Sequence, residues 1–294
     1  FIFYISGCGA FSSAQTALSL ADQATTGGQT HALDIQCTTA DTSVGASEYA
    51  FIYHLVEAQN CQHLKFGTSS AVDLTIQFYV KSNLTGTTCG FIAKEDGGGG
   101  ATYCQAPFEF TINSANTWEK KVVTIPSNAV IQASSSIINN DNGAGIGIGF
   151  NLVMGDNYDN GTNLTWETGG ASYATTNQLN FLSSTNNDFF ITGLQVEVGN
   201  DASDFEHLPI DVQLQRCFRY CFQVNPAQYD PTTVGSCNSS DSCISHYFFP
   251  VEMRGDPSLT TSGTASDYVI YEAGDVHACS AIPQANTINN FAMR

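Results

Sequence analysis

The side chains that could perform catalysis are scattered along this chain. No HExxH or GxSxG motif is present, and the six histidines stand far apart: His31, His54, His63, His207, His246 and His277. Asp201, Asp204 and Glu206 form an acidic cluster that could supply a glycosidase pair, which needs two carboxyl groups about 5 to 9 Å apart. A solvated turn explains the same cluster. We therefore assign no catalytic residue and predict that the protein is not an enzyme.

Sugar binding has better support, because aromatic and amide side chains alternate in one glycine-rich region. The apolar C–H face of a sugar packs on an aromatic ring while its hydroxyls bond to nearby amides. The candidate rings are Tyr158, Trp166 and Tyr173, and the candidate amides are Asn157, Asn160, Asn163 and Gln178. The alternative for Trp166 is a role as a hydrophobic anchor of its loop. Trp118, at the start of an expected strand, is assigned to the core.

The same region could hold calcium, although no cofactor is otherwise expected. In GDNYDNGTN, Asp156, Asp159 and Asn160 could supply the hard oxygen ligands that Ca²⁺ prefers. Their spacing departs from that of an EF-hand loop. A turn rich in Asn and Asp is the favoured explanation of the sequence, since these side chains bond to their own backbone.

Ten cysteines, an even number, indicate disulfides formed outside the reducing cytosol. Cys89 and Cys104 flank a glycine-rich stretch that could turn a hairpin and bring the two sulfurs together. Cys237 and Cys243 bracket the polar loop NSSDS in the same way. The alternative is free buried thiols that behave as small apolar side chains.

The charge of the chain excludes two classes of partner. Nine basic and 27 acidic residues give a formal net charge of −18, whereas a nucleic-acid-binding surface needs clustered Lys and Arg. Anionic membranes likewise attract basic segments, and no apolar run approaches the roughly 20 residues that cross a bilayer. We expect neither a nucleic acid nor a membrane as partner.

Alternating apolar residues predict an all-β protein. Leu74, Ile76, Phe78 and Val80 alternate with polar or amphipathic residues, as in a two-sided strand. In GAGIGIGFNLVM, isoleucines face one way and Gly147 and Gly149 the other, which indicates that something packs closely against that backbone. Strands at this spacing, separated by turn clusters, favour an antiparallel jelly-roll sandwich.

The strand pattern also predicts the domain organisation. Residues 1–30 are expected to form an N-terminal arm or linker, residues 31–207 the jelly roll, and residues 208–294 a smaller β-domain involved in oligomer contacts. From Cys217, the apolar residues Phe218, Tyr220, Phe222 and Val224 alternate, which predicts a strand whose aromatic face packs against identical copies.

Four segments resemble, in order and spacing, a module of tail-fibre and other virion structural proteins of marine tailed phages. They begin at AFIYHLVEAQNCQHLKF, FTINSANTWEKKVVTIP, NNDNGAGIGIGFNL and ITGLQVEVGNDASDFEHLPIDVQLQRCFRY, and YFFPVEMRGDPSLTTSG is similar to a downstream part. The resemblance covers roughly residues 30 to 265. It implies a carbohydrate-binding-like jelly roll on the particle.

We therefore predict a non-enzymatic virion structural protein, namely a tail fibre, appendage or surface decoration subunit, located on the virion surface or outside the cell. Its expected partners are identical subunits, with a trimer favoured, other virion proteins and a cell-surface glycan. Repetition of a weak site by symmetry would then supply avidity. The alternative is a secreted carbohydrate-binding module of a polysaccharide-active protein.

Overall fold

The computed structural model describes residues 1–96, 103–225, 232–239, 242–272, 275–282, 288 and 292–293. The chain divides into two compact units, Phe1–Glu206 and His207–Arg294. None of the helices within the described ranges is long and apolar enough to cross a membrane.

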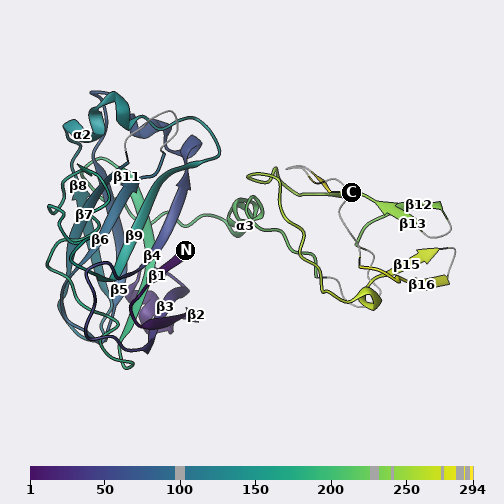
Figure 1. Ribbon diagram of the computed structural model, residues 1–294, viewed down its shortest axis with the longest axis horizontal. Coiled ribbons are helices and arrows are strands. Elements are labelled where there is room, and N and C mark those ends of the chain that lie inside the picture. The colour runs from purple at the N-terminus through teal and green to yellow at the C-terminus, as the bar shows by residue number, and fades with distance from the viewer. Residues whose placement is uncertain are drawn as a thin grey trace. The chain divides into compact units, whose positions relative to one another are not determined.

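The first unit is an antiparallel jelly-roll β-sandwich, as the sequence predicts (Figure 1). Its six-stranded sheet contains, in spatial order, β1 (Ile2–Ser6), β4 (Tyr49–Glu57), β9 (Ala144–Met154), β6 (Gly86–Lys94), β7 (Cys104–Ile112) and β10 (Glu167–Thr168). The five-stranded sheet contains β2 (Ala10–Ala17), β3 (His31–Thr39), β11 (Asp188–Val198), β5 (Leu74–Lys81) and β8 (Glu119–Ile125). Neighbouring strands in both sheets run antiparallel.

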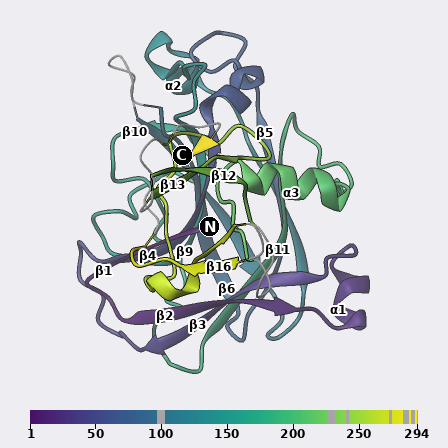
Figure 2. The same ribbon diagram turned by 90° about the vertical axis from the view of Figure 1, so that its right-hand side faces the viewer.

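Short helical turns connect some of these strands. The helix α1 (Leu20–Thr25) lies between β2 and β3 in the chain (Figure 2), and Ser19 caps it by accepting a hydrogen bond from the Asp22 amide. The helix α2 (Ala129–Gln132) begins at Asn128, whose side chain accepts from the amides of Val130 and Ile131. The 3₁₀ turns η1 (Ala58–Asn60) and η2 (Gln62–Leu64) lie between β4 and β5, and η4 (Ser134–Ser136) lies between β8 and β9.

The prediction of an N-terminal arm is wrong, because residues 2–17 supply one strand to each sheet. Ile2–Ser6 pairs with Tyr49–Tyr53 of β4, and Ala10–Ala17 pairs with His31–Thr39 of β3. Gly7 and Gly9, both with positive φ, turn the chain from one sheet to the other. The polar composition of SSAQT concealed this strand, which lies at an exposed edge and needs little apolar surface.

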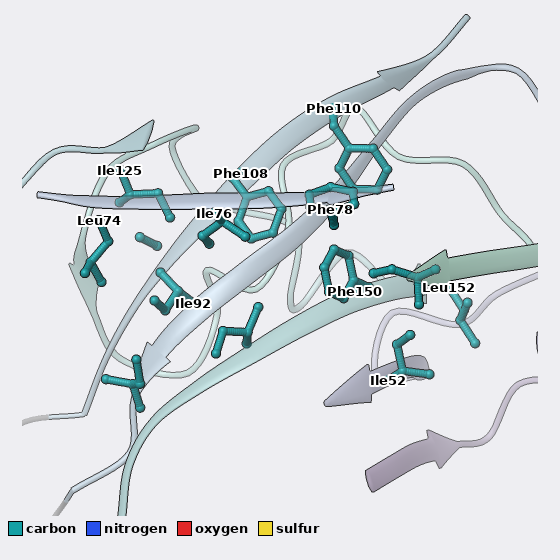
Figure 3. Packing of buried hydrophobic residues seen from close by; sticks show 14 of the residues in the cluster. Ile52, Leu74, Ile76, Phe78, Ile92, Phe108, Phe110, Ile125, Phe150 and Leu152 are labelled. Atoms are coloured by element: carbon teal, nitrogen blue, oxygen red, sulfur yellow. The ribbon is translucent and has the colours of Figure 1, made fainter. Parts of the chain in front are cut away.

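The core lies between the two sheets. Phe78 of β5 packs against Phe150 of β9 and Phe110 of β7, with ring centroids 4.8 and 5.0 Å apart (Figure 3). Leu74, Ile76, Phe78 and Val80 all point inward, so the alternation seen in the sequence is confirmed. Each such side chain contributes about 1.5–3 kcal/mol by leaving water.

The second unit is small and built from short two-stranded sheets. It contains α3 (Ile210–Phe218), β12 (Gly235–Ser239), β13 (Ser242–Ser245), β14 (Tyr247–Phe248), the 3₁₀ turn η5 (Ala265–Asp267), β15 (Val269–Glu272), β16 (Asp275–Ala278) and β17 (Ala292–Met293). Cys237 and Cys243 face each other across β12 and β13 and form the predicted disulfide.

Two further expectations are wrong. Cys89 and Cys104 are both buried and form no disulfide, because β6 and β7 pair Cys89 with Glu109 and Cys104 with Lys94. This register places Cys104 in the core between the sheets and Cys89 on the outer face of the six-stranded sheet. The segment predicted as a strand from Cys217 instead belongs to α3 and the turn that follows, so it presents no aromatic strand face for assembly.

Candidate functional site: an aromatic face on the six-stranded sheet

Eight aromatic side chains gather on the outer face of the six-stranded sheet, away from the core. We call this set the aromatic face: Tyr4, Tyr49, Phe51, Tyr53, Phe91, Tyr103, Tyr158 and Tyr173. They come from β1, β4, β6, the residue preceding β7, and the loop of residues 155–180. Strand alternation explains the gathering, since Phe51 and Tyr53 face outward while Ala50 and Ile52 face the core.

Two glycines of β9 make room for the inner rings. A Cβ atom on Gly149 would lie 2.2 Å from Cε1 of Phe91, and one on Gly147 would lie 1.9 Å from the hydroxyl of Tyr53. The rings therefore lie directly on the β9 backbone, which confirms the close packing that the glycine face predicts.

The rings form two stacks that meet edge to face. Tyr4 stacks on Phe51 with centroids 4.9 Å apart, and Tyr53 stacks on Phe91 at 5.4 Å. Phe51 meets Phe91 edge-on at 5.3 Å, and Tyr173 meets Phe91 edge-on at 4.9 Å. Stacked and edge-to-face pairs are the favoured aromatic geometries, so the rings hold one another in fixed positions. Tyr53 and Phe91 are buried, whereas Tyr4 is exposed.

Glu95 organises the polar edge of the aromatic face. Its Oε1 accepts hydrogen bonds from the hydroxyls of Tyr53 and, at 3.3 Å, Tyr103, and the Tyr103 hydroxyl also lies 3.2 Å from that of Tyr173. Burial and the neighbouring carboxylate raise the pKa of Tyr53 and of Tyr103 well above 10, and burial raises that of Tyr173. The phenols therefore remain protonated and keep Glu95 as their acceptor.

Buried amides lie on the same side of the sheet. Gln105 of β7 pairs with Ala93, which is buried among the rings of the aromatic face, and neither polar atom of the Gln105 side chain has a hydrogen-bond partner. The Oδ1 of Asn151 is likewise without a partner, while its Nδ2 donates to the Tyr173 carbonyl at 2.8 Å. A buried amide group that lacks a hydrogen-bond partner lowers the free energy of unfolding.

The loop of residues 155–180 brings two of the predicted rings to this face. The amides of Tyr173 and Ala174 donate to the Tyr158 carbonyl at 3.0 and 3.1 Å. Gln178 bonds the backbone of Met154 in both directions, at 2.9 and 2.8 Å, and so fastens the loop to the end of β9. The geometry thus unites Tyr158 and Tyr173 with rings that are over 50 residues away in sequence.

The predicted amides lie in the same loop but at its polar rim. Asn157 donates to the Ser47 hydroxyl at 2.8 Å, and the Asn163 side chain accepts from the Glu109 amide at 3.0 Å. Both side chains fix the loop to strands or turns of the sandwich. Their role toward a glycan stays a prediction.

Trp166 cannot serve as an exposed sugar platform, which corrects the expectation for it. Only 1% of its surface is exposed, and its ring meets Phe66 edge-on at 5.4 Å within the main core. Asn128 also donates to its carbonyl at 2.9 Å. The alternative reading, a hydrophobic anchor of the loop, describes its position.

The expected calcium ligands lie near one another, in a turn whose bonds are partly internal. Asn160 donates its Nδ2 to the Asp156 carbonyl at 2.6 Å, and Asp159 accepts from Gln178 at 3.5 Å. Burial, followed by the charge of Asp156, raises the pKa of Asp159. Within the described ranges no three His, Cys, Asp or Glu side chains group as metal ligands. Calcium binding through an amide and two carboxylates stays a prediction.

The acidic cluster of residues 201–206 lies along the other sheet. The Ser203 carbonyl accepts from Gln77 at 2.8 Å, and the Glu206 amide donates to Gln195 at 2.8 Å. This segment is a strap on the outer side of β5 and β11, remote in the sheet order from the strands of the aromatic face.

Sequence reasoning missed most of the aromatic face. Tyr4, Tyr49, Phe51, Tyr53, Phe91, Tyr103 and Glu95 were not predicted as site residues. The available signal was the alternation Tyr49, Phe51, Tyr53 together with the glycine face of residues 147 and 149, since large rings must lie opposite residues without side chains.

No protein-family model and no curated protein matches the chain. Among solved structures it is similar to the xylan-binding CBM22-2 domain of Paenibacillus barcinonensis Xyn10C (12% identity, 67% of this chain, 91% of that one, TM-score 0.33). It is also similar to the family 11 carbohydrate-binding module of Clostridium thermocellum Lic26A-Cel5E (12% identity, 68% of this chain, 88% of that one, TM-score 0.35). A third similar structure is the enzymatically active domain of bacteriophage CBA120 tailspike protein 4 (10% identity, 67% of this chain, 19% of that one, TM-score 0.34). Because these TM-scores lie below 0.5, function is argued from the chain's own residues.

Proposed function

We propose that this protein binds a glycan on the aromatic face and does not transform it. This proposal rests on one observation: eight aromatic rings lie beside a carboxylate and two buried amides on the outer face of the six-stranded sheet. Rings take the C–H faces of sugars, and carboxylate, phenol and amide groups take their hydroxyls. Tyr4 is the most accessible entry point, with 39% of its surface exposed on the edge strand.

A glycan array with the purified chain tests this proposal. The expected result is binding to one or a few related polysaccharides, with no release of reducing ends from them on prolonged incubation. Absence of binding across neutral, basic and acidic glycans would refute glycan recognition. Release of reducing ends would refute the non-catalytic assignment.

The place of the protein in a virion appendage is a second part of the proposal, supported by the sequence resemblance to tail-fibre proteins and by helix α3. One side of the α3 segment packs within its own unit. Phe222 lies 5.3 Å from Phe218 and 5.7 Å from Tyr247, and Arg219 donates to the Glu252 carbonyl at 3.1 Å.

The other side of α3 is apolar and exposed. Ile210 and Leu214 are 71% and 46% exposed, and Cys217 and Cys221 are exposed as well. The amide of Cys221 bonds to the Cys217 carbonyl at 3.0 Å and so extends the helical turn. These four residues follow one another at intervals of four, three and four positions, which is the spacing of the apolar seam between two paired helices. The intervals are the same in both directions, so the α3 helix of a second copy fits the seam parallel or antiparallel. We expect a homo-oligomer, with a trimer favoured, in an extracellular location.

Light scattering of the full chain in reducing buffer separates this assembly from the alternative, a monomeric secreted carbohydrate-binding module. Leu214→Glu places a charge in the seam and should dissociate the oligomer. Gln215→Glu adds the same charge at an exposed position outside the seam and should leave it intact. A monomeric wild-type chain, or an oligomer that tolerates Leu214→Glu, would contradict pairing through α3.

A further inference from the structure

The aromatic face has an electrostatic bias that follows from where the lysines stand. The first unit contains five lysines, Lys65, Lys81, Lys94, Lys120 and Lys121, and no arginine. Lys81, Lys120 and Lys121 belong to the five-stranded sheet, and Lys65 follows η2. Lys94 lies on β6, but it is fully buried and points to the opposite side of the sheet from Ala93, which packs with the rings of the aromatic face. No lysine or arginine side chain from the strands of the six-stranded sheet therefore points into the aromatic face.

Carboxylates, by contrast, border the face on several sides. Glu95 lies among the phenols of Tyr53 and Tyr103. Glu109, on the outward positions of β7, accepts from Thr175 at 2.6 Å and from Asn177 at 3.1 Å. Asp159 lies in the loop that carries Tyr158. These contacts come from neutral donors, which leave the negative charge of each group in place.

The hydrogen bonds also fix the polarity of the site. Because the phenols of Tyr53 and Tyr103 donate to Glu95, their oxygens can only accept, and that of Tyr103 does so from the Tyr173 hydroxyl at 3.2 Å. The unpaired Oδ1 of Asn151 is a further acceptor in the cluster. Acceptors under a negative potential favour the donor groups of a ligand, such as hydroxyl or ammonium groups, and the negative potential repels carboxylate or sulfate groups.

Resting on the proposed function, we infer that the aromatic face selects glycans by charge: it binds neutral and amine-bearing sugars and excludes uronic acid and sulfated sugars. Glu95 is the specificity-determining residue, because it is the carboxylate bonded directly to two of the rings. Its replacement by glutamine keeps an acceptor oxygen for the phenols and removes only the charge.

Matched glycans of equal backbone test the inference. The probes are β-1,4-glucan oligosaccharides, chitosan oligosaccharides with free amines and oxidised cellouronate oligosaccharides, with β-1,4-mannan and polymannuronate as a second pair. We expect the ammonium and hydroxyl forms to bind at least about tenfold more tightly than the carboxylate forms at low salt. Raising the salt to 1 M, where the screening length falls to about 3 Å, should shrink that ratio.

Variants assign the selectivity to Glu95. Glu95→Gln should reduce the ratio between ammonium and carboxylate probes several-fold, whereas Asp201→Asn, which removes an exposed carboxylate in the strap on the other sheet, should leave it unchanged. Carboxylate glycans that bind as tightly as the neutral forms would overturn the inference while the proposed function stands. Binding to no glycan of any charge would overturn the proposed function itself. An unchanged ratio in Glu95→Gln would refute the role given to Glu95.

Discussion

Removal of the Tyr4 ring is the most informative single change on the aromatic face. Tyr4 is 39% exposed and stacks on Phe51 at 4.9 Å, so its free side is open to a ligand. A tyrosine buries about 200 Å² when covered, and 39% of that is about 80 Å². At about 25 cal/mol per Å², complete coverage by a sugar would contribute about 2 kcal/mol. Tyr4→Ala should therefore weaken glycan binding by up to about 30-fold.

Isothermal titration calorimetry with the glycan identified on the array measures this loss. Tyr220→Ala is the matched control, because Tyr220 is 56% exposed but belongs to the second unit. The melting temperature of each variant should be recorded, since Tyr4→Ala also removes one aromatic pair worth about 0.5–1.5 kcal/mol. An affinity for the glycan that changes less than twofold in a folded Tyr4→Ala protein would refute the binding face.

Three further predictions concern stability. Trp166→Ala should lower the free energy of unfolding by about 3–5 kcal/mol in denaturant titrations, because the ring is buried in the core; a loss below 1 kcal/mol would contradict that position. Tyr53 and Tyr103 have a raised pKa, so their contribution to stability is complete below pH 10 and is lost as the pH rises further. Since Tyr53 should carry no phenolate charge in the folded protein at pH 11, Tyr53→Phe should have the same phenolate absorbance as the wild type; a smaller absorbance would contradict the raised pKa. Burial raises the pKa of Glu119, but hydrogen bonds from Lys121, Ser114 and Asn113 together bring it below its usual value. Stability should therefore fall as the pH drops below about 4.5, and Glu119→Gln should flatten this dependence of the melting temperature.

The strands of the sandwich could be predicted because burial on one side imposes a strict alternation. Leu74 to Val80 and the glycine face of β9 carried that information directly. The strand expected at Cys217 failed for a specific reason: Phe218 and Phe222 are four residues apart, a spacing that fits both an alternating strand and a helix face. The apolar residues at 210, 214, 217 and 221 add the helical period.

The site was harder to predict than the fold, because it is assembled across strands. The loop composition indicates Tyr158 and Tyr173 as candidates, but Phe51 and Phe91, which pack against Tyr173, lie in strands that look like ordinary core. Trp166 was misplaced because a ring in a glycine-rich loop resembles an exposed platform, whereas this loop folds back and inserts the ring beside Phe66. The spacing of residues in the sequence does not show that the loop folds back onto the core.

The most direct test of the central claim is chemical-shift mapping by NMR of the full chain with the glycan returned by the array. The account predicts that the amides that shift on titration cluster on β1, β4 and β6, around Tyr4, Phe51 and Glu95, and that β5 and β8 of the other sheet stay unchanged. Shifts confined to the five-stranded sheet or to the second unit would contradict it.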